Sequence, residues 1–165
     1  MSFHVVLVEP EIPQNTGNIS RTCAATDTVL HLVRPLGFEI TDKHLKRAGL
    51  DYWKFLKLEY HDSFDEVLEK YDKGDNFWYY STKSGLPHTA PGLKDGDFLV
   101  FGKETRGLPE PLLEKYYDRC RRIPMLSETR SLNLSNAVAV GLYEGLRQAD
   151  FPGLSDKGAL TGRQD

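Results

Sequence analysis

Short apolar runs alternate with longer amphipathic segments along this chain. Each run spans a few residues and is bounded by polar residues, Gly or Pro, a pattern typical of buried β-strands. The predicted strands cover residues 3–8, 29–33, 76–81, 98–101 and 119–123. The amphipathic segments predict helices over residues 15–26, 42–48, 64–71, 109–117 and 132–148.

Two of the predicted helices begin with capping signals. Ser63 precedes one helix and Glu66 follows three residues later, which together form a capping box. Asn15 or Thr16 is expected to cap the first helix. The alternation of strands and helices predicts an α/β fold, with a mostly parallel sheet and helices on both faces. Ligands of such folds bind beyond the carboxyl ends of the strands, so the segments that follow strands are the candidate sites.

The composition fits one folded domain. The chain has 165 residues, of which 39% are hydrophobic and 27% charged. We expect a single domain over residues 1–153 and a flexible tail over residues 154–165. No apolar run approaches the ~18 residues of a membrane span, and the N-terminus lacks the basic region of a signal peptide. We therefore expect a cytoplasmic protein without a membrane partner, in which Cys23 and Cys120 are free thiols.

Several common site motifs are absent from the sequence. No Gly-x-Gly-x-x-Gly occurs, which argues against a Rossmann oxidoreductase. Gly102 and Gly107 have the spacing of a P-loop, but Leu108 and Pro109 follow where phosphate and magnesium binding need Lys and Ser or Thr. The His residues are scattered without the spacing of metal ligands, so no metal site is expected.

The first polar segment after a strand covers residues 9–22. Within it, Asn18 and Arg21 are three residues apart and share one face of the predicted helix. Arg21 lies in the first turns, where the helix dipole already favours an anion, so this face suits an RNA phosphate. The alternative is that Arg21 forms an ion pair with Glu9 or Glu11.

The second polar segment covers residues 102–109. Gly102 follows a strand directly, and a residue without a Cβ lets a ligand approach the backbone closely. Glu104 is the carboxylate of this segment and lies between Lys103 and Arg106 in the sequence. An exposed charged turn accounts for the same composition, so the segment alone leaves both interpretations open.

The third polar segment covers residues 123–136 and leads into the longest predicted helix. Asn133 and Asn136 are three residues apart and share a face at the helix entrance. The helix itself is apolar on nearly all sides, and Gly141 and Gly145 let another backbone come close. Either a subunit interface or a position in the centre of the core explains that pattern.

Together, the three polar segments resemble the motifs of SpoU-type RNA methyltransferases of the SPOUT superfamily. The resemblance is to the small members that methylate the wobble ribose of tRNA. The matching stretches are residues 9–21, 101–109, 123–125 and 130–138, with residues 47–52 and 82–83 in support. Lys103 departs from the pattern, since members often have Pro there. The resemblance extends over about residues 3–153.

The resemblance implies a C-terminal trefoil knot, S-adenosylmethionine as cofactor without a metal, tRNA as partner, and a homodimer. It implies donor binding by Tyr80, Thr82, Gly102, Glu104, Ile123, Ser131, Leu132 and Asn136, with Glu104 and Asn136 near the methyl group. The implied catalytic residues are Arg21, Asn133 and Ser135. The implied RNA contacts are Asn15, Asn18, Arg21, Lys43, Lys46, Arg47 and Arg130. The implied subunit contacts are Gly141, Tyr143 and Gly145.

The implied reaction is 2′-O-methylation of the wobble cytidine or modified uridine, with leucine tRNAs as candidate substrates. The alternatives are methylation of another tRNA or rRNA ribose, or a non-catalytic RNA-binding dimer. A net charge of −3 argues against RNA binding, but the charge is unevenly distributed. Residues 43–57 and 119–130 are basic, whereas residues 61–75 are acidic. The basic patches therefore support an RNA surface near the site, although solvated charged faces are the simpler alternative.

Overall fold

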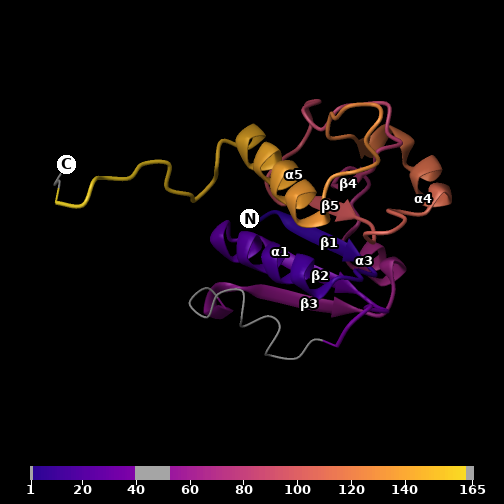
Figure 1. The fold of residues 1–165 in the computed structure, drawn as a ribbon, viewed down its shortest axis with the longest axis horizontal. Coiled ribbons are helices and arrows are strands. Elements are labelled where there is room, and N and C mark those ends of the chain that lie inside the picture. Colours follow the sequence, from indigo (N-terminus) through magenta and orange to yellow (C-terminus); the bar gives the residue numbers. More distant parts are fainter. Residues whose placement is uncertain (1, 40–52, 163–165) are drawn as a thin grey trace.

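A six-stranded parallel sheet forms the centre of the molecule in a computed structural model, which describes residues 2–39 and 53–162 (Figure 1). The strands pair in the order β3-β2-β1-β5-β4-β6. They are β1 (His4–Val8), β2 (Val29–Val33), β3 (Lys57–His61), β4 (Phe77–Tyr80), β5 (Phe98–Phe101) and β6 (Cys120–Arg121). All their ladders are parallel, which confirms the predicted sheet.

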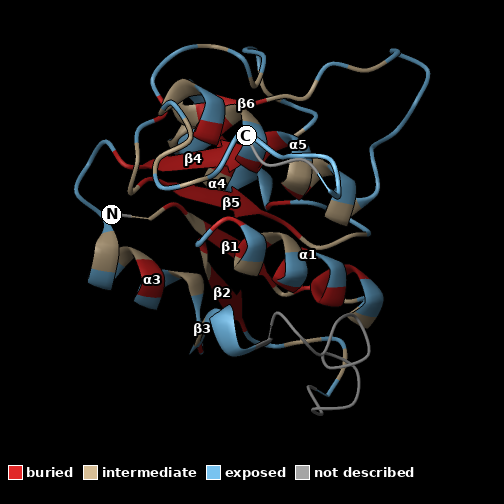
Figure 2. Cartoon of the chain, turned by 90° about the vertical axis from the view of Figure 1, so that its left-hand side faces the viewer, coloured by how far each residue is buried: buried red, intermediate tan, exposed pale blue. Residues whose placement is uncertain are grey.

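Helices cover both faces of the sheet, as predicted (Figure 2). The helices are α1 (Pro13–Ala25), α3 (Phe64–Tyr71), α4 (Glu110–Lys115) and α5 (Leu134–Gln148), with short 3-10 turns η1 (Trp53–Phe55) and η2 (Tyr117–Arg119). The apolar sides of α1 and α5 share one cluster with Val5 and Leu7 of β1. Those of α3 and α4 share the other with Val6 and Val8, because successive strand residues point to opposite faces.

The helix ends differ from the sequence expectations at α1. This helix begins at Pro13, with Ile12 as N-cap, so neither Asn15 nor Thr16 caps it. Proline suits a first helical position because it has no N–H that needs a partner there. The cap at Ser63 is confirmed, since its hydroxyl accepts from the Glu66 N–H, although the Glu66 carboxylate bonds the N–H of Asp62.

Sequence patterns missed β3, and the predicted helix over residues 42–48 lies outside the described residues. Within residues 2–39 and 53–162, this strand pairs with β2 alone and lies at the edge of the sheet. Leu58 is its one aliphatic residue, and Lys57 and Tyr60 are exposed. An edge strand of this composition lacks the continuous apolar run of a central strand, so its pairing with β2 is what identifies it.

The strand order reverses direction between β1 and β5, which makes this position the switch point of the sheet. The first polar segment leaves β1 here, and the second leaves β5 directly beside it. Because parallel strands end at one edge, segments far apart in the sequence meet at this edge. The ligand site is expected there.

The glycines of α5 face the core of their own subunit. A Cβ on Gly141 would lie 3.0 Å from the Tyr80 ring, and one on Gly145 would lie 3.1 Å from Leu93. Both glycines are buried in the subunit, so the prediction that they contact a second subunit is corrected for these two positions. Tyr143 points outward with 47% of its surface exposed, and its place in an interface stays a prediction.

The chain after α5 leaves the body of the molecule, as Figure 1 shows. Phe151 and Leu154 still pack against the core, whereas residues 155–162 are exposed. The domain boundary at residue 153 and the flexibility of the tail stay predictions. No helix in the described part of the chain has both the length and the apolar character that crossing a membrane requires.

Candidate functional site

A cavity of about 850 Å³ lies at the switch-point edge of the sheet. It is formed by the second and third polar segments, the start of α1 and the residues that follow β4. Its lining residues are Ile12, Asn15, Tyr80, Ser81, Thr82, Lys83, Phe101, Gly102, Lys103, Glu104, Thr105, Arg106, Gly107, Leu108, Arg121, Ile123, Met125, Arg130, Ser131, Leu132, Asn133, Leu134 and Ala137. The volume is within the usual range for small-molecule sites.

Most of the predicted cofactor residues line this cavity. They are Tyr80, Thr82, Gly102, Glu104, Ile123, Ser131 and Leu132. Asn133, Asn15 and Arg130 join them, although they were assigned to catalysis or RNA binding. Asn136, Ser135, Asn18 and Arg21 are outside the lining set. The predicted residues therefore divide into a cavity group and a group next to it.

Two glutamates join the first and second polar segments. The Glu104 carboxylate accepts hydrogen bonds from the backbone N–H groups of Glu11, at 3.0 Å, and Ile12. In return, the Glu11 carboxylate accepts from the Thr105 N–H at 3.0 Å and the Thr105 hydroxyl at 2.8 Å. These bonds from Thr105 lower the pKa of Glu11. The Glu104 carboxylate thus holds the start of α1 in position. The prediction that Glu104 lies near the methyl group did not include this contact.

Gly102 allows the second polar segment to fold back on itself. A Cβ there would lie 2.1 Å from the carbonyl carbon of Gly107 and 2.3 Å from the nitrogen of Leu108. The turn is closed by the Gly107 N–H, which donates to the Lys103 carbonyl at 2.8 Å. The close approach predicted for a ligand is therefore made by the protein's own backbone, and Gly102 shapes the cavity wall.

Asn133 ties α5 to α1. Its carboxamide oxygen caps α5 by accepting from the Ser135 and Asn136 N–H groups at 2.9 and 3.3 Å. Its Nδ2 donates to the Asn15 side chain at 3.1 Å. Asn, with a short polar side chain, favours such a cap over a helix interior. The first and third polar segments are thereby held together beside the cavity.

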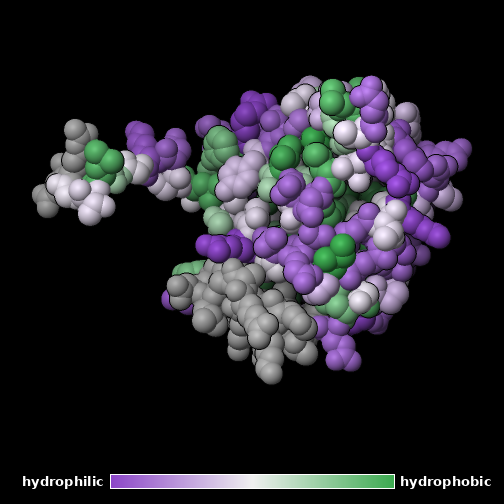
Figure 3. Space-filling model, in the orientation of Figure 1, coloured by the Kyte–Doolittle hydropathy of each residue, from purple (hydrophilic) through white to green (hydrophobic). Residues whose placement is uncertain are grey.

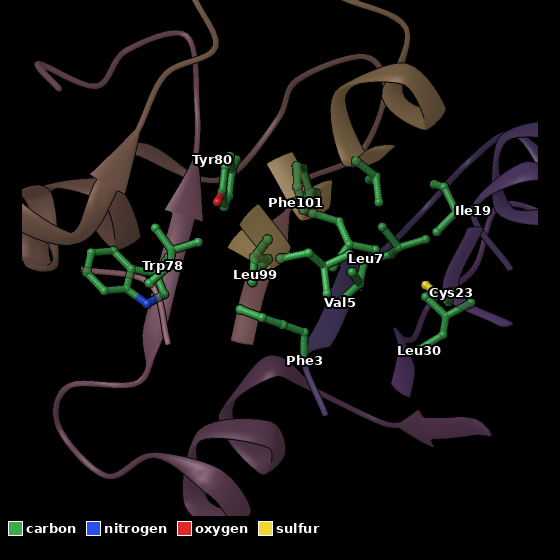
Figure 4. Close-up of a cluster of buried hydrophobic side chains, with 14 of the residues drawn as sticks. Phe3, Val5, Leu7, Ile19, Cys23, Leu30, Trp78, Tyr80, Leu99 and Phe101 are labelled. Atoms are coloured by element: carbon green, nitrogen blue, oxygen red, sulfur yellow. The ribbon is translucent and has the colours of Figure 1, made fainter. Parts of the chain in front are cut away.

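Two buried polar atoms of residues that line the cavity have no hydrogen-bond partner among the described residues. They are the Tyr80 hydroxyl and the Nε of Arg121. The Tyr80 ring stacks on Phe101 with the centroids 4.6 Å apart, and both side chains appear at the end of their strands in Figure 4. Burial raises the pKa of Tyr80, so its hydroxyl is a donor at neutral pH. Buried donors of this kind are available to a polar ligand. Arg121 is not among the site residues that the sequence predicts.

The predicted RNA contacts are partly on the outer face of α1. Asn18 and Arg21 are both exposed there, as expected from their spacing. The ion-pair alternative for Arg21 stays open, although Thr105 donates to one oxygen of the Glu11 carboxylate. Lys43, Lys46 and Arg47 lie outside the described residues.

The histidines are less scattered than their spacing indicated. His4, His31 and His61 come from three adjacent strands and form a connected row on the α3 side of the sheet. The row is not part of the cavity lining. Spacing along the chain contains no signal for this contact, because pairing between strands creates it.

The fold and cavity define an α/β protein with a small-molecule site at the switch point of a parallel sheet, beside an exposed polar helix face. The model of the SpoU rRNA Methylase family matches residues 2–143. The chain belongs to this family.

Relatives of known name agree with this assignment. A tRNA (cytidine(34)-2′-O)-methyltransferase from Saccharophagus degradans is 50% identical over 152 residues, which cover 92% of this chain and 98% of that protein. A solved structure described under "Structural insights into the 2-OH methylation of C/U34 on tRNA" has a TM-score of 0.83 at 46% identity, and covers 89% of this chain and 95% of its own. AviRb of Streptomyces viridochromogenes in complex with AdoMet has a TM-score of 0.77 at 23% identity and shares the fold, covering 89% of this chain and 57% of its own.

Proposed function

We propose that this protein transfers a methyl group from S-adenosylmethionine to the ribose 2′-oxygen of the wobble nucleotide, cytidine or uridine 34, of tRNA. One observation carries the proposal: all three polar segments that resemble the methyltransferase motifs contribute to one cavity and its surroundings. The Saccharophagus degradans relative, which is named for this reaction, aligns with nearly the whole chain.

The residues that line the cavity fit the cofactor. Ile123, Leu132 and Phe101 supply an apolar surface for an adenine ring. The unpartnered Tyr80 hydroxyl and Arg121 Nε supply buried donors for polar groups of the cofactor. When bound, S-adenosylmethionine provides a methyl group that its sulfonium already activates. The protein's task is then mainly to bind, orient and exclude water.

Arg21 is the residue that we propose acts on the RNA. Arginine side chains act in proteins as cations and hydrogen-bond donors, so we assign Arg21 no role in removing the proton of the 2′-hydroxyl. It instead holds the neighbouring phosphate and stabilises the negative charge that develops on the ribose oxygen. Asn18 lies on the same exposed face of α1, and Asn133 and Ser135 at the start of α5 orient the ribose.

The test is methylation of transcribed tRNAs by the purified protein with labelled S-adenosylmethionine, followed by mapping of the modified nucleotide. We expect the label at position 34, with leucine tRNAs tested first. Methylation at another ribose would identify a different RNA position. Binding of tRNA without cofactor binding in calorimetry would instead identify a non-catalytic RNA-binding protein.

A knotted C-terminal region is also part of the proposal. The support is main-chain pairing between the loop after β4 and the segment after β6: Arg122 donates to the Leu86 carbonyl at 2.8 Å, and His88 to the Arg122 carbonyl. The two loops run side by side before the chain enters α5 (Figure 1).

The proposed active form is a homodimer in the cytoplasm. The support is apolar surface on and near α5, where Leu132, Val140 and Tyr143 are 39%, 41% and 47% exposed. Figure 3 shows apolar patches over α5 and the loops beside it. A second copy would cover this surface and add a second basic segment to the RNA-binding face. Sedimentation equilibrium measures this state directly.

A further inference from the structure

Two histidines and a glutamate converge on the side of the sheet that α3 covers. Nδ1 of His31 in β2 is 2.9 Å from Nε2 of His61 in β3, and 3.0 Å from Oε2 of Glu59. The register pairs His31 with Glu59 and Val33 with His61, which places all three side chains on one face. The three ligand atoms lie within 4.8 Å of one another.

Further hydrogen bonds orient the histidine and the carboxylate. Nε2 of His31 is 2.8 Å from Nδ1 of His4, so in the tautomer that donates there Nδ1 of His31 carries the lone pair. The Tyr71 hydroxyl donates to both Glu59 oxygens, at 2.8 and 2.6 Å, and Lys70 donates at 3.2 Å. Partners of this kind fix the tautomer and direction of metal-binding His and carboxylate groups.

The residue types of the cluster also suit a cation. Imidazole nitrogen and carboxylate oxygen are ligands that zinc takes in proteins. Two imidazole nitrogens and one carboxylate oxygen lie close to the same point.

We propose that His31, Glu59 and His61 bind one Zn²⁺ ion, with water as the fourth ligand. Zinc binds imidazole nitrogen and carboxylate oxygen at about 2.0–2.2 Å, so ligand atoms of a tetrahedral site are about 3.3–3.5 Å apart. The observed separations of 2.9 and 3.0 Å need to widen by only about 0.5 Å. Glu59, whose side chain is 33% exposed, provides the path to solvent. Magnesium and calcium are unsuited, because they prefer oxygen ligands alone.

The ion would fasten the edge strand β3 to β2. Among the described strands, β3 pairs with β2 alone, and it has one aliphatic residue, so it depends on β2 and α3 for its place. None of the three ligands lines the cavity at the switch point. The site is therefore expected to change stability and to leave methyl transfer unchanged.

Calorimetric titration of the chelator-treated protein with ZnCl₂ tests the proposal. We expect one ion per chain with a dissociation constant below about 10 µM. Glu59→Gln and His61→Asn should each weaken binding at least about 10-fold. Glu69→Gln makes the same chemical change at an exposed position of α3 and should bind as the wild type does. Excess Zn²⁺ should raise the melting temperature of the wild type and Glu69→Gln by roughly 5 °C, and not that of Glu59→Gln.

Spectroscopy identifies the ligands independently. Co²⁺ in place of Zn²⁺ should give the intense visible absorption of a four-coordinate ion, and X-ray absorption on the zinc form should show imidazole ligands. Wild-type protein that binds no Zn²⁺ tighter than about 10 µM would overturn the proposal, as would unchanged binding in Glu59→Gln and His61→Asn. Glu59→Gln removes a partly exposed group, so its fold, checked by circular dichroism, and its cofactor binding should match the wild type. A defect in cofactor binding alone would concern the proposed methyl transfer and not this site.

Discussion

Replacing Gly102 with Ala tests whether the closed turn of the second polar segment shapes the cofactor cavity. The added Cβ would lie 2.1 Å from the carbonyl carbon of Gly107 and 2.3 Å from the nitrogen of Leu108, whereas ordinary contacts begin at 3.4 Å. Both neighbours are backbone atoms, so no side-chain rotation relieves the overlap. The turn must move by more than about 1 Å to reach ordinary packing distances.

That movement disrupts the hydrogen bonds on which the cavity wall depends. The Gly107 N–H loses its bond to Lys103, worth about 1 kcal/mol. The hydrogen bond between the Glu104 carboxylate and the Glu11 N–H is charge-assisted, and its contribution of about 1.5–3 kcal/mol is lost as well. The combined loss is about 2.5–4 kcal/mol, which corresponds to a decrease in cofactor affinity on the order of 100-fold.

Calorimetric titration with S-adenosylmethionine and thermal unfolding measure the two consequences. We expect the Gly102→Ala melting temperature to fall by about 5–16 °C. Gly107→Ala is the matched control in the same turn: its φ of +68° makes Ala unfavourable by about 1 kcal/mol, but nothing lies within 4 Å of the new Cβ. Cofactor affinity of Gly102→Ala within threefold of the wild type would refute the reasoning.

Three further predictions concern the RNA face, the α5 cap and acid stability. Arg21→Lys should bind tRNA within threefold of the wild type but reduce single-turnover methylation at least about 100-fold, because a point charge does not reproduce the guanidinium fork; unchanged turnover would contradict this. Asn133→Ala should lower stability by about 1–2 kcal/mol in urea unfolding, since it removes the cap of α5 and the bond to Asn15, and a loss below about 0.3 kcal/mol would contradict this. Burial lowers the pKa of His4 to about 4, so the unfolded chain binds more protons between pH 6.5 and 4. Stability, measured as the urea midpoint in the presence of a chelator, should therefore fall as the pH is lowered from 6.5 to 4, and it should fall less in His4→Phe. An equal dependence of the urea midpoint on pH in both proteins would contradict the assignment.

The sequence was sufficient for the central strands and the position of the site. Apolar runs identified β1, β2, β4 and β5 because a strand buried on both faces must be apolar along its length. Parallel strands end at one edge, so the polar segments after them had to meet. Seven of the predicted cofactor residues accordingly line the cavity.

Local sequence patterns do not predict contacts between segments that are distant in the sequence. Glu104 was expected near a methyl group, but its carboxylate binds the backbone at the start of α1. Gly141 and Gly145 fitted a subunit interface and a central helix equally well, and the nearby Tyr80, Phe101 and Leu93 side chains decide for the core. Arg121 entered the site through its burial beside the cavity, which charge counting does not detect.

The chain by itself thus determined the centrally buried strands, where they end and which motifs follow them, because burial on both faces requires a continuous apolar run. Only the tertiary structure decided which side chains face one another. The edge strand β3, and with it the cluster of His31, Glu59 and His61, depends on register between strands. Register is a relation between two segments, and neither segment carries it alone.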